Sequence, residues 1–282
     1  MVYLLLTVNG LLMVLAPVLV IWLLRRYRSV SWRLWGIGAA AFILSQVGHI
    51  PFNSLVNRLW QPDPQADFIP LVLFLGFSAG LFEEVTRYLT FRYWAKEARS
   101  WGQGLMVGAG HGGIEAILTG VLFFLGFINL ALYQSGMLDS ALAGASADEV
   151  ALMDAAATQM FSIPWYEAVL GGVERLFAVT LHLSLSLLVL RAVTRKQVGW
   201  VAAAITWHAL ANAGAIYLAQ KVGPIAAEGF LALIAALSLA FIFATRTPEP
   251  TPAIPEPLPA PTPITLKPVS IESTKLDDSR YQ

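Results

Sequence analysis

The sequence contains no cysteine and few charged residues. Without cysteine the chain has no disulfide, no thiolate metal site and no cysteine nucleophile. Only 13% of the 282 residues are charged, compared with about 25% in soluble domains. The formal net charge is zero, so there is no basic excess that would indicate a nucleic-acid partner. Hydrophobic residues, in contrast, make up 57% of the chain, and this composition predicts an integral membrane protein.

The hydrophobic residues are grouped in seven long runs. A membrane-spanning helix needs about 20 mostly apolar residues, and runs of this kind occupy 3–24, 34–56, 68–94, 103–131, 165–190, 198–219 and 225–245. The sequence therefore predicts an all-α, polytopic membrane protein with about seven transmembrane helices, in which residues 1–246 form one transmembrane helical domain. Between the fourth and fifth runs, residues 136–160 have the mild amphipathic pattern of a short interfacial helix.

Positively charged residues gather on one side of the predicted membrane. Short loops rich in Lys and Arg stay in the cytoplasm. Such residues end or follow the first, third, fifth and seventh runs: Arg25, Arg26, Arg28, Arg33, Arg92, Lys96, Arg99, Arg191, Arg195, Lys196 and Arg246. We therefore expect the N-terminus outside the cell and the C-terminus in the cytoplasm. The last segment, 247–282, is rich in proline and predicts a disordered cytoplasmic tail.

Ionisable and polar side chains interrupt the predicted spans. A charged group at the centre of a bilayer costs about 2.5–3.5 kcal/mol on insertion scales, and such groups usually face the bundle interior and mark a functional site. All four histidines of the chain fall within spans. The whole set comprises His49, Glu83, Glu84, Arg87, His111, Glu115, Glu174, Arg175, His182, His208 and Asn212. The helices that bear the candidate site therefore lie roughly within residues 68–219.

The depth and spacing of these polar residues predict that most of them lie close together in the membrane. Counted from the cytoplasmic end of each span at about 1.5 Å per residue, six side chains lie roughly 12–21 Å deep: Glu83, His111, Glu115, His182, His208 and Asn212. Residues spaced i,i+4 share a helix face, and this spacing relates Glu83 to Arg87, His111 to Glu115, and His208 to Asn212. It predicts that Arg87 pairs with Glu83 and holds it ionised. One of the adjacent glutamates would then react while the other supports it.

Two smaller groups have a simpler explanation. His49 shares a helix face with Gln46 and Asn53, and we expect hydrogen-bonded packing there. Glu174 and Arg175 lie in the outer half of their span and are expected to form an interhelical ion pair. The remaining carboxylates and imidazoles suit three tasks: hydrolysis by an activated water, metal binding, and translocation of a proton or cation.

Four motifs, in this order on successive spans, carry a resemblance: EEVTR at 83–87, HGGIE at 111–115, ERLFAVTLH at 174–182 and HALAN at 208–212. Over residues 35–245 they resemble the YhfC family of bacterial membrane proteins. That family is similar to the superfamily of CAAX proteases, bacteriocin-processing proteins (CPBP) and PrsW-type proteases, as a distant branch. The resemblance implies a multi-pass intramembrane protease of the bacterial cell membrane.

The resemblance also implies roles for residues at matching positions. Glu83 and Glu84 match the paired glutamates, one of which activates water, and Glu115 matches the residue that assists. His208 and Asn212 match the motif that stabilises the oxyanion.

Two departures from the superfamily pattern involve further residues. The first motif reads EExxR instead of EExxxR, so Arg87 faces the glutamates differently. His111 stands where the superfamily usually has phenylalanine. Together with His182, the additional histidine of this branch, and His208, it forms a candidate metal set, for which zinc is the candidate ion.

The hypothesis from the sequence is an intramembrane peptidase that hydrolyses a membrane-associated peptide or protein with a glutamate-activated water, with or without a metal. Arg87 would orient its partner glutamate. The substrate would approach from the lipid bilayer or the cytoplasmic face, and no nucleic acid is involved. Two alternatives stay open: a non-catalytic membrane scaffold or regulator of a partner protein, and a proton- or cation-coupled transporter.

Overall fold

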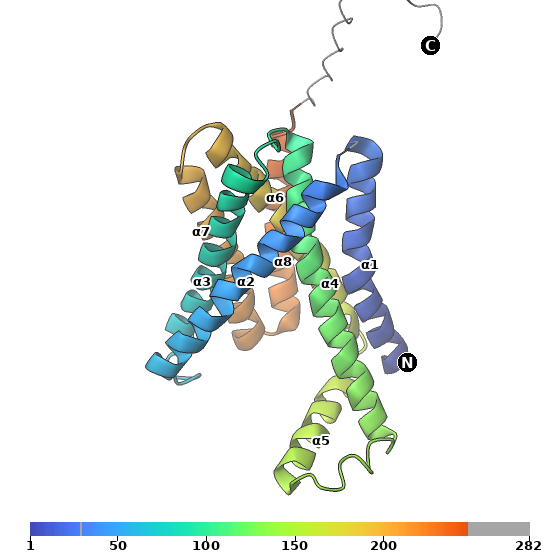
Figure 1. Ribbon diagram of the computed structural model, residues 1–282. Coiled ribbons are helices and arrows are strands. Elements are labelled where there is room, and N and C mark those ends of the chain that lie inside the picture. Colours follow the sequence, from blue (N-terminus) through green and yellow to red (C-terminus); the bar gives the residue numbers. More distant parts are fainter. Residues whose placement is uncertain (29, 248–282) are drawn as a thin grey trace, which may run out of the picture. The chain divides into compact units, whose positions relative to one another are not determined.

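The structure, a computed structural model, describes residues 1–28 and 30–247 (Figure 1). Its elements are α1 (Val2–Arg28), α2 (Trp32–Trp60), α3 (Phe68–Leu89), the π-helical turn η1 (Thr90–Trp94), α4 (Trp101–Gln134), α5 (Ala147–Phe161), the 3-10 turn η2 (Glu167–Val169), α6 (Leu170–Thr194), α7 (Gly199–Lys221) and α8 (Pro224–Ala244). No strand occurs in these ranges. In the same ranges, seven helical segments, α5 excluded, are long and apolar enough to cross a membrane. The all-α, seven-span prediction is thereby confirmed, whereas the predicted tail beyond Thr247 lies outside the described residues.

Several helices extend beyond the apolar runs from which they were predicted. α1 continues to Arg28 and α4 to Gln134, because arginine and glutamine are good helix formers and their long side chains reach water from a helix end. The short helix expected within 136–160 begins only after Ser146. The Ser146 hydroxyl accepts from the N–H of Glu149, and the Glu149 carboxylate accepts from the N–H of Ser146 at 2.8 Å. This reciprocal cap sets the start of α5.

α4 packs against α1, α2 and α6, while α3 packs against α2 and α7. α8 completes the bundle against α6 and α7. In Figure 1, α2 runs obliquely across α3 and α4. The four helices that carry the polar motifs, α3, α4, α6 and α7, are therefore neighbours around a common interior.

α2 and α4 cross so closely that their contact requires glycine. A Cβ on Gly38 would lie 2.1 Å from the carbonyl oxygen of Val107, and a Cβ on Gly110 would lie 2.1 Å from that of Trp35. Non-bonded atoms normally meet at about 3.5 Å or more. Because His111 directly follows Gly110, this crossing fixes the position of that histidine relative to α2.

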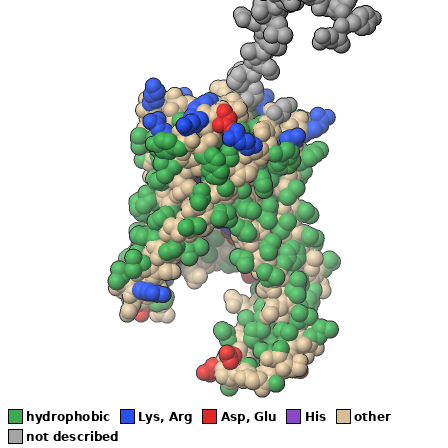
Figure 2. All heavy atoms as spheres, viewed as in Figure 1, with side chains coloured by type: hydrophobic (Ala, Val, Ile, Leu, Met, Phe, Trp, Pro, Cys, Tyr) green, Lys and Arg blue, Asp and Glu red, His purple; other side chains and the backbone are tan. Residues whose placement is uncertain are grey.

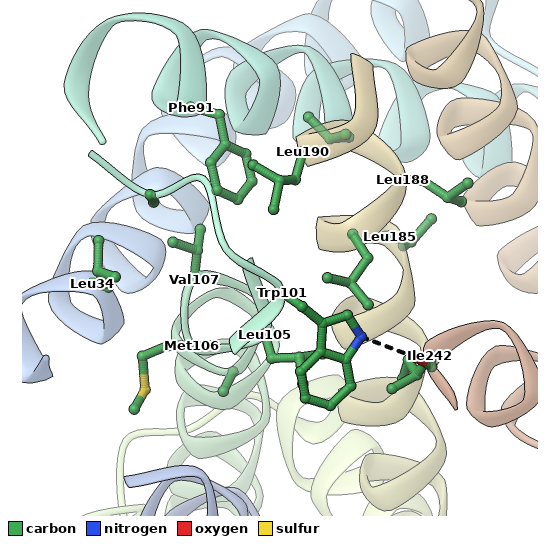
Figure 3. Packing of buried hydrophobic residues seen from close by; sticks show 14 of the residues in the cluster. Leu34, Phe91, Trp101, Leu105, Met106, Val107, Leu185, Leu188, Leu190 and Ile242 are labelled. Atoms are coloured by element: carbon green, nitrogen blue, oxygen red, sulfur yellow. Dashed lines mark hydrogen bonds between the residues drawn. The ribbon is translucent and has the colours of Figure 1, made fainter. Parts of the chain in front are cut away.

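An apolar layer closes the bundle at its arginine-rich end. It joins α2, η1, α4 and α6 through buried side chains, among them Leu34, Phe91, Leu105, Met106, Val107, Leu185, Leu188 and Leu190 (Figure 3). Trp101 extends the layer to α8, since its Nε1 donates to the carbonyl oxygen of Ile242 at 3.0 Å. Figure 2 shows most of the visible Lys and Arg side chains at this end and hydrophobic side chains covering much of the flank.

Candidate active site

α3 brings two glutamates and an arginine into the interior of the bundle. Glu84 and Arg87 have no exposed surface, and Glu83 is 6% exposed. A glycine one turn earlier lets α7 come close, since a Cβ on Gly80 would lie 2.8 Å from a carbonyl oxygen of α7. This close approach presents His208 of α7 to both glutamates.

Arg87 pairs with Glu84 and not with Glu83. Its Nη1 lies 2.8 and 2.6 Å from the two carboxylate oxygens of Glu84, and its Nη2 donates to Nδ1 of His182 at 3.0 Å. The expected pair of Arg87 with Glu83 is therefore wrong. Residues three and four apart both lie on one helix face, so spacing alone could not choose between the two glutamates.

Glu83 is held by side chains of two other helices. Gln46 of α2 donates from Nε2 to Oε1 at 3.2 Å, and Nε2 of His111 on α4 lies 3.0 Å from Oε2. Nε2 of His208 lies 3.9 Å from the same Oε2. Within the described part of the chain, no Lys or Arg forms an ion pair with Glu83. Apart from the neutral amide of Gln46, the described side chains that contact the Glu83 carboxylate are therefore imidazoles.

His208 connects the two glutamates. Its Nδ1 lies 2.9 Å from Oε1 of Glu84. An ionised carboxylate only accepts hydrogen bonds, so Nδ1 carries the proton and, in the neutral imidazole, Nε2 keeps its lone pair toward Glu83. A carboxylate bound to the far nitrogen of an imidazole is also the usual support of a metal-binding histidine.

α4 and α6 contribute a second carboxylate and imidazole. Oε2 of Glu115 lies 2.7 Å from Nε2 of His182, and Oε1 accepts from Nη1 of Arg175 at 2.9 Å. Arg175 also contacts Glu174, its neighbour in sequence. The interhelical ion pair of Arg175 is thus made with Glu115. Arg175 therefore belongs to the site, which was not predicted from the sequence.

Three imidazoles lie in succession across the interior. The ring centroids of His111 and His182 are 5.1 Å apart, and those of His182 and His208 are 5.3 Å apart. α4 and α6 meet closely here, since a Cβ on Gly112 would lie 2.7 Å from Cβ of His182. We call the whole assembly the buried cluster: Glu83, Glu84, Arg87, His111, Glu115, Arg175, His182 and His208. Glu115 and Arg175, whose side chains are 23% and 13% exposed, form its edge.

His49 lies beside the buried cluster in a network of neutral groups. Its Nε2 lies 3.1 Å from Oγ of Ser78 and 2.9 Å from Nδ2 of Asn53, and its Nδ1 lies 3.3 Å from Oε1 of Gln46. These contacts fit the hydrogen-bonded packing expected for His49. Gln46, on the same helix face as His49, also donates to Glu83 and so links the two networks.

Two adjoining cavities connect the buried cluster with one end of the bundle. A cavity of about 90 Å³ is lined by residues that include Glu83, Glu115, His182, His208 and Asn212. A single water needs about 10–15 Å³, so several waters fit. A second cavity of about 410 Å³, between η2, α6, α7 and α8, shares three lining residues with the first: Glu174, Ala215 and Leu231. It leads to the end where α6 begins, opposite the apolar layer.

Glu83, His182 and His208 form a buried group that fits a metal ion. Each offers one ligand atom, and these atoms lie within 4.8 Å of one another. Carboxylate oxygen and imidazole nitrogen are ordinary zinc ligands. His208 is the histidine best oriented to bind an ion through Nε2, because the Glu84 carboxylate accepts a hydrogen bond from its Nδ1. His182 accepts from Arg87 at Nδ1, so its neutral ring carries the proton on Nε2. It would bind an ion only after Nε2 loses this proton or Nδ1 loses the hydrogen bond from Arg87.

This group differs in one residue from the metal set expected from the sequence, which was His111, His182 and His208. The structure puts Glu83 in the place of His111. Nε2 of His111 faces Glu83, while its Nδ1 has no hydrogen-bond partner among the described residues. His111 therefore positions the carboxylate of Glu83.

The fold and the buried cluster define the class: a polytopic helical membrane protein with carboxylates, imidazoles and arginines enclosed in its interior. A family model described as "YhfC intramembrane metalloprotease" matches residues 12–235. The chain belongs to the YhfC family. The "Uncharacterized membrane protein YhfC" of Bacillus subtilis (strain 168) is 35% identical over 248 residues, which cover 84% of this chain and 93% of that protein. No solved structure matches the chain.

Proposed function

We propose that this protein is an intramembrane peptidase of the bacterial cell membrane, in which Glu83 takes a proton from the water that attacks a peptide bond. The observation that carries the proposal is the setting of Glu83. It is buried, lines the inner cavity and has no cationic partner other than imidazoles among the described residues. Glu84 is instead engaged by Arg87. A buried carboxylate within reach of water is the usual form of a general base.

Glu84 and Arg87 act through His208. Arg87 fixes the carboxylate of Glu84, which accepts from Nδ1 of His208. Nε2 of His208 is thereby directed to the cavity, where it donates to an oxyanion only when the ring is protonated. Asn212, one turn further along α7, lines the same cavity, and its amide donates in every state. We propose that His208 and Asn212 donate hydrogen bonds to the carbonyl oxygen of the scissile bond.

Glu115 and His182 are placed to hold the proton that the leaving amine takes up. Peptide hydrolysis requires a proton on the leaving amine, and a carboxylate–imidazole pair beside the water site supplies one. Nε2 of His182 and Oε2 of Glu115 are 2.7 Å apart, and both residues line the inner cavity. Arg175 fixes the other oxygen of Glu115.

The family description implies a metal, and the residues that would hold it are Glu83, His182 and His208. A bound ion, with zinc as the candidate, would supply Lewis-acid charge for the carbonyl or the water. Glu83 would then be a ligand. In that case Glu115 is the other carboxylate of the buried cluster that lines the cavity, and it would take the proton.

We also infer that the substrate, a membrane-associated peptide or protein, reaches the buried cluster from the end where α6 begins. The larger cavity leads there, and the apolar layer lies at the other end. With the orientation that the arginine-rich loops favour, this is the outer half of the membrane and not the cytoplasmic face. The paired glutamates and the motif order support a place for the family as a distant branch of the CPBP superfamily.

Metal content and cleavage together test the proposal. The purified protein is compared with His182→Ala, His208→Ala and Glu83→Gln by elemental analysis. New protein N-termini in the membrane fraction are then compared between cells that make the wild type and each variant. We expect Glu83→Gln to abolish the new N-termini and Glu97→Gln, at an exposed position, to preserve them. Unchanged cleavage by Glu83→Gln, Glu84→Gln and His208→Ala would refute the assignment.

The same variants separate the two alternatives. For a scaffold or regulator, they would disturb stability and partner assembly, and no N-terminus would depend on the protein. For a proton- or cation-coupled transporter, proteoliposomes would show a flux that follows the pH gradient and stops in Glu83→Gln.

A further inference from the structure

A separate cavity lies at the arginine-rich end of the bundle. It has a volume of about 220 Å³ and lies among α4, α6 and the residues that follow α8. It shares no lining residue with the cavity at the buried cluster. A single water needs only about 10–15 Å³, so the space fits a polar group of several atoms.

The ionisable residues that line this cavity are all arginines: Arg99, Arg191 and Arg195. Arg191 and Arg195 are one helical turn apart, and neither has a carboxylate partner in the described ranges. The guanidinium of Arg191 lies 5.3 Å from the ring centroids of Trp200 and of Phe241. Aromatic rings attract a cation without removing its charge. Two adjacent like charges repel each other, and an anion between them would relieve that repulsion.

Three other polar side chains of this cavity bind the backbone of its wall. Arg99 donates to the backbone carbonyls of Phe91, Ala95 and Ala98, which fixes its charge there. The hydroxyls of Thr194 and Thr245 donate to backbone carbonyls of their own helices. Their oxygens therefore keep lone pairs that accept from hydroxyl groups of a ligand.

We propose that this cavity binds the phosphate of an anionic phospholipid headgroup. Arginine matches phosphate oxygens with pairs of parallel hydrogen bonds, and basic pockets between transmembrane helices on the cytoplasmic side bind such headgroups. The position favours a lipid over free phosphate. The cavity lies at the ends of membrane-spanning helices beside Trp101 and Trp200, and tryptophan is enriched at the membrane–water boundary, so the acyl chains can stay in the bilayer.

Lipid-dependent thermal unfolding of the full chain in detergent tests this site. Phosphatidylglycerol, phosphatidylcholine or inorganic phosphate is added, and the midpoint of unfolding is followed. We expect only phosphatidylglycerol to raise the midpoint. Each removed arginine should weaken its binding about fivefold, so the Arg191→Gln/Arg195→Gln variant should bind about 30-fold more weakly. The matched control, Arg26→Gln/Arg92→Gln, removes two exposed charges outside the cavity and should respond like the wild type.

Native mass spectrometry of the same samples shows which proteins retain the lipid. Equal retention by the wild type and the Arg191→Gln/Arg195→Gln variant would overturn the proposal. A full response to inorganic phosphate alone would overturn the lipid assignment, and no response to either anion would overturn the site. Should the double variant fail to fold, Arg195→Gln alone, at an exposed position, is expected to show the fivefold effect.

Discussion

At the scale of single residues, Arg87 holds the buried cluster together. It donates to both oxygens of Glu84 and to His182, so it links α3 to α6, and it has no exposed surface. Removal of one partner from a buried ion pair costs about 3–5 kcal/mol. We predict a loss of that size in the free energy of unfolding for Arg87→Ala. Arg87→Lys should lose part of it, because an ammonium lacks the planar fork.

An exposed ion pair provides the control for Arg87. Arg33 contacts Glu97 at 2.7 Å, but the two side chains are 66% and 46% exposed. Such pairs contribute about 0–1 kcal/mol, so Arg33→Ala should leave thermal unfolding in detergent almost unchanged. Equal losses in Arg33→Ala and Arg87→Ala would mean that the Arg87 pair is worth no more than a surface pair.

The members of the buried cluster other than Arg175 could be predicted, but their partners could not. Glutamates and histidines inside spans indicated a common site because such residues are costly in lipid, and the structure does bring them together. The partner of Arg87 and the recruitment of Arg175 depend on how each helix is rotated about its axis, which hydropathy does not define. One feature of the sequence does indicate that Arg175 lies near the site. It precedes His182 by seven residues and so lies on the same helix face.

At the scale of elements, the crossing of α2 and α4 depends on glycine. A Cβ on Gly110 would overlap the backbone of α2, and forced overpacking costs about 1–3 kcal/mol or more. We predict that Gly110→Ala lowers thermal stability by this amount and displaces His111 from Glu83. Gly36→Ala on α2 is the matched control, because its Cβ would meet nothing within 4 Å. It should be neutral or stabilising by up to about 1 kcal/mol, and similar behaviour of the two variants would contradict the close crossing.

The start of α5 should depend on pH. Hydrogen bonds from the backbone N–H and then the hydroxyl of Ser146 lower the pKa of Glu149. A carboxyl with a lowered pKa in the folded state stabilises at pH above its unfolded value, and this contribution is lost as the pH falls through the folded value. Amide-exchange protection of α5, corrected for intrinsic rates, should therefore be full well above the unfolded pKa of about 4.3 and fall as the pH is lowered below it. Glu149→Gln keeps the cap but not the charge, and its protection should be independent of pH.

The elements could be predicted to within a few residues, because long apolar runs must be helical in lipid. Their ends were less predictable. The π-helical turn η1 continues α3. Arg99 donates to the carbonyl of Phe91 in η1 and to those of Ala95 and Ala98 in the loop that follows. This contact joins η1 to the loop before α4, and the hydropathy of α3 does not predict it.

At the scale of the whole molecule, the lack of cysteine makes orientation directly measurable, since each introduced cysteine is unique. We predict that Ser140→Cys, between α4 and α5, reacts with an impermeant maleimide on intact cells. Gln197→Cys, between α6 and α7, should react only after permeabilisation. The reverse pattern would place the N-terminus in the cytoplasm and would also reverse the side from which the larger cavity is reached.

The apolar layer has an energetic consequence for the cell. An energised membrane stores work as a voltage, about 2.3 kcal/mol for each elementary charge at about 100 mV. A continuous row of water and carboxylates across the membrane would let protons flow down that voltage. Phe91, Met106 and Leu185 have no exposed surface and follow the buried cluster toward the arginine-rich end. They interrupt such a row. The protein can thus keep titratable groups deep in the bilayer and still act as an electrical insulator.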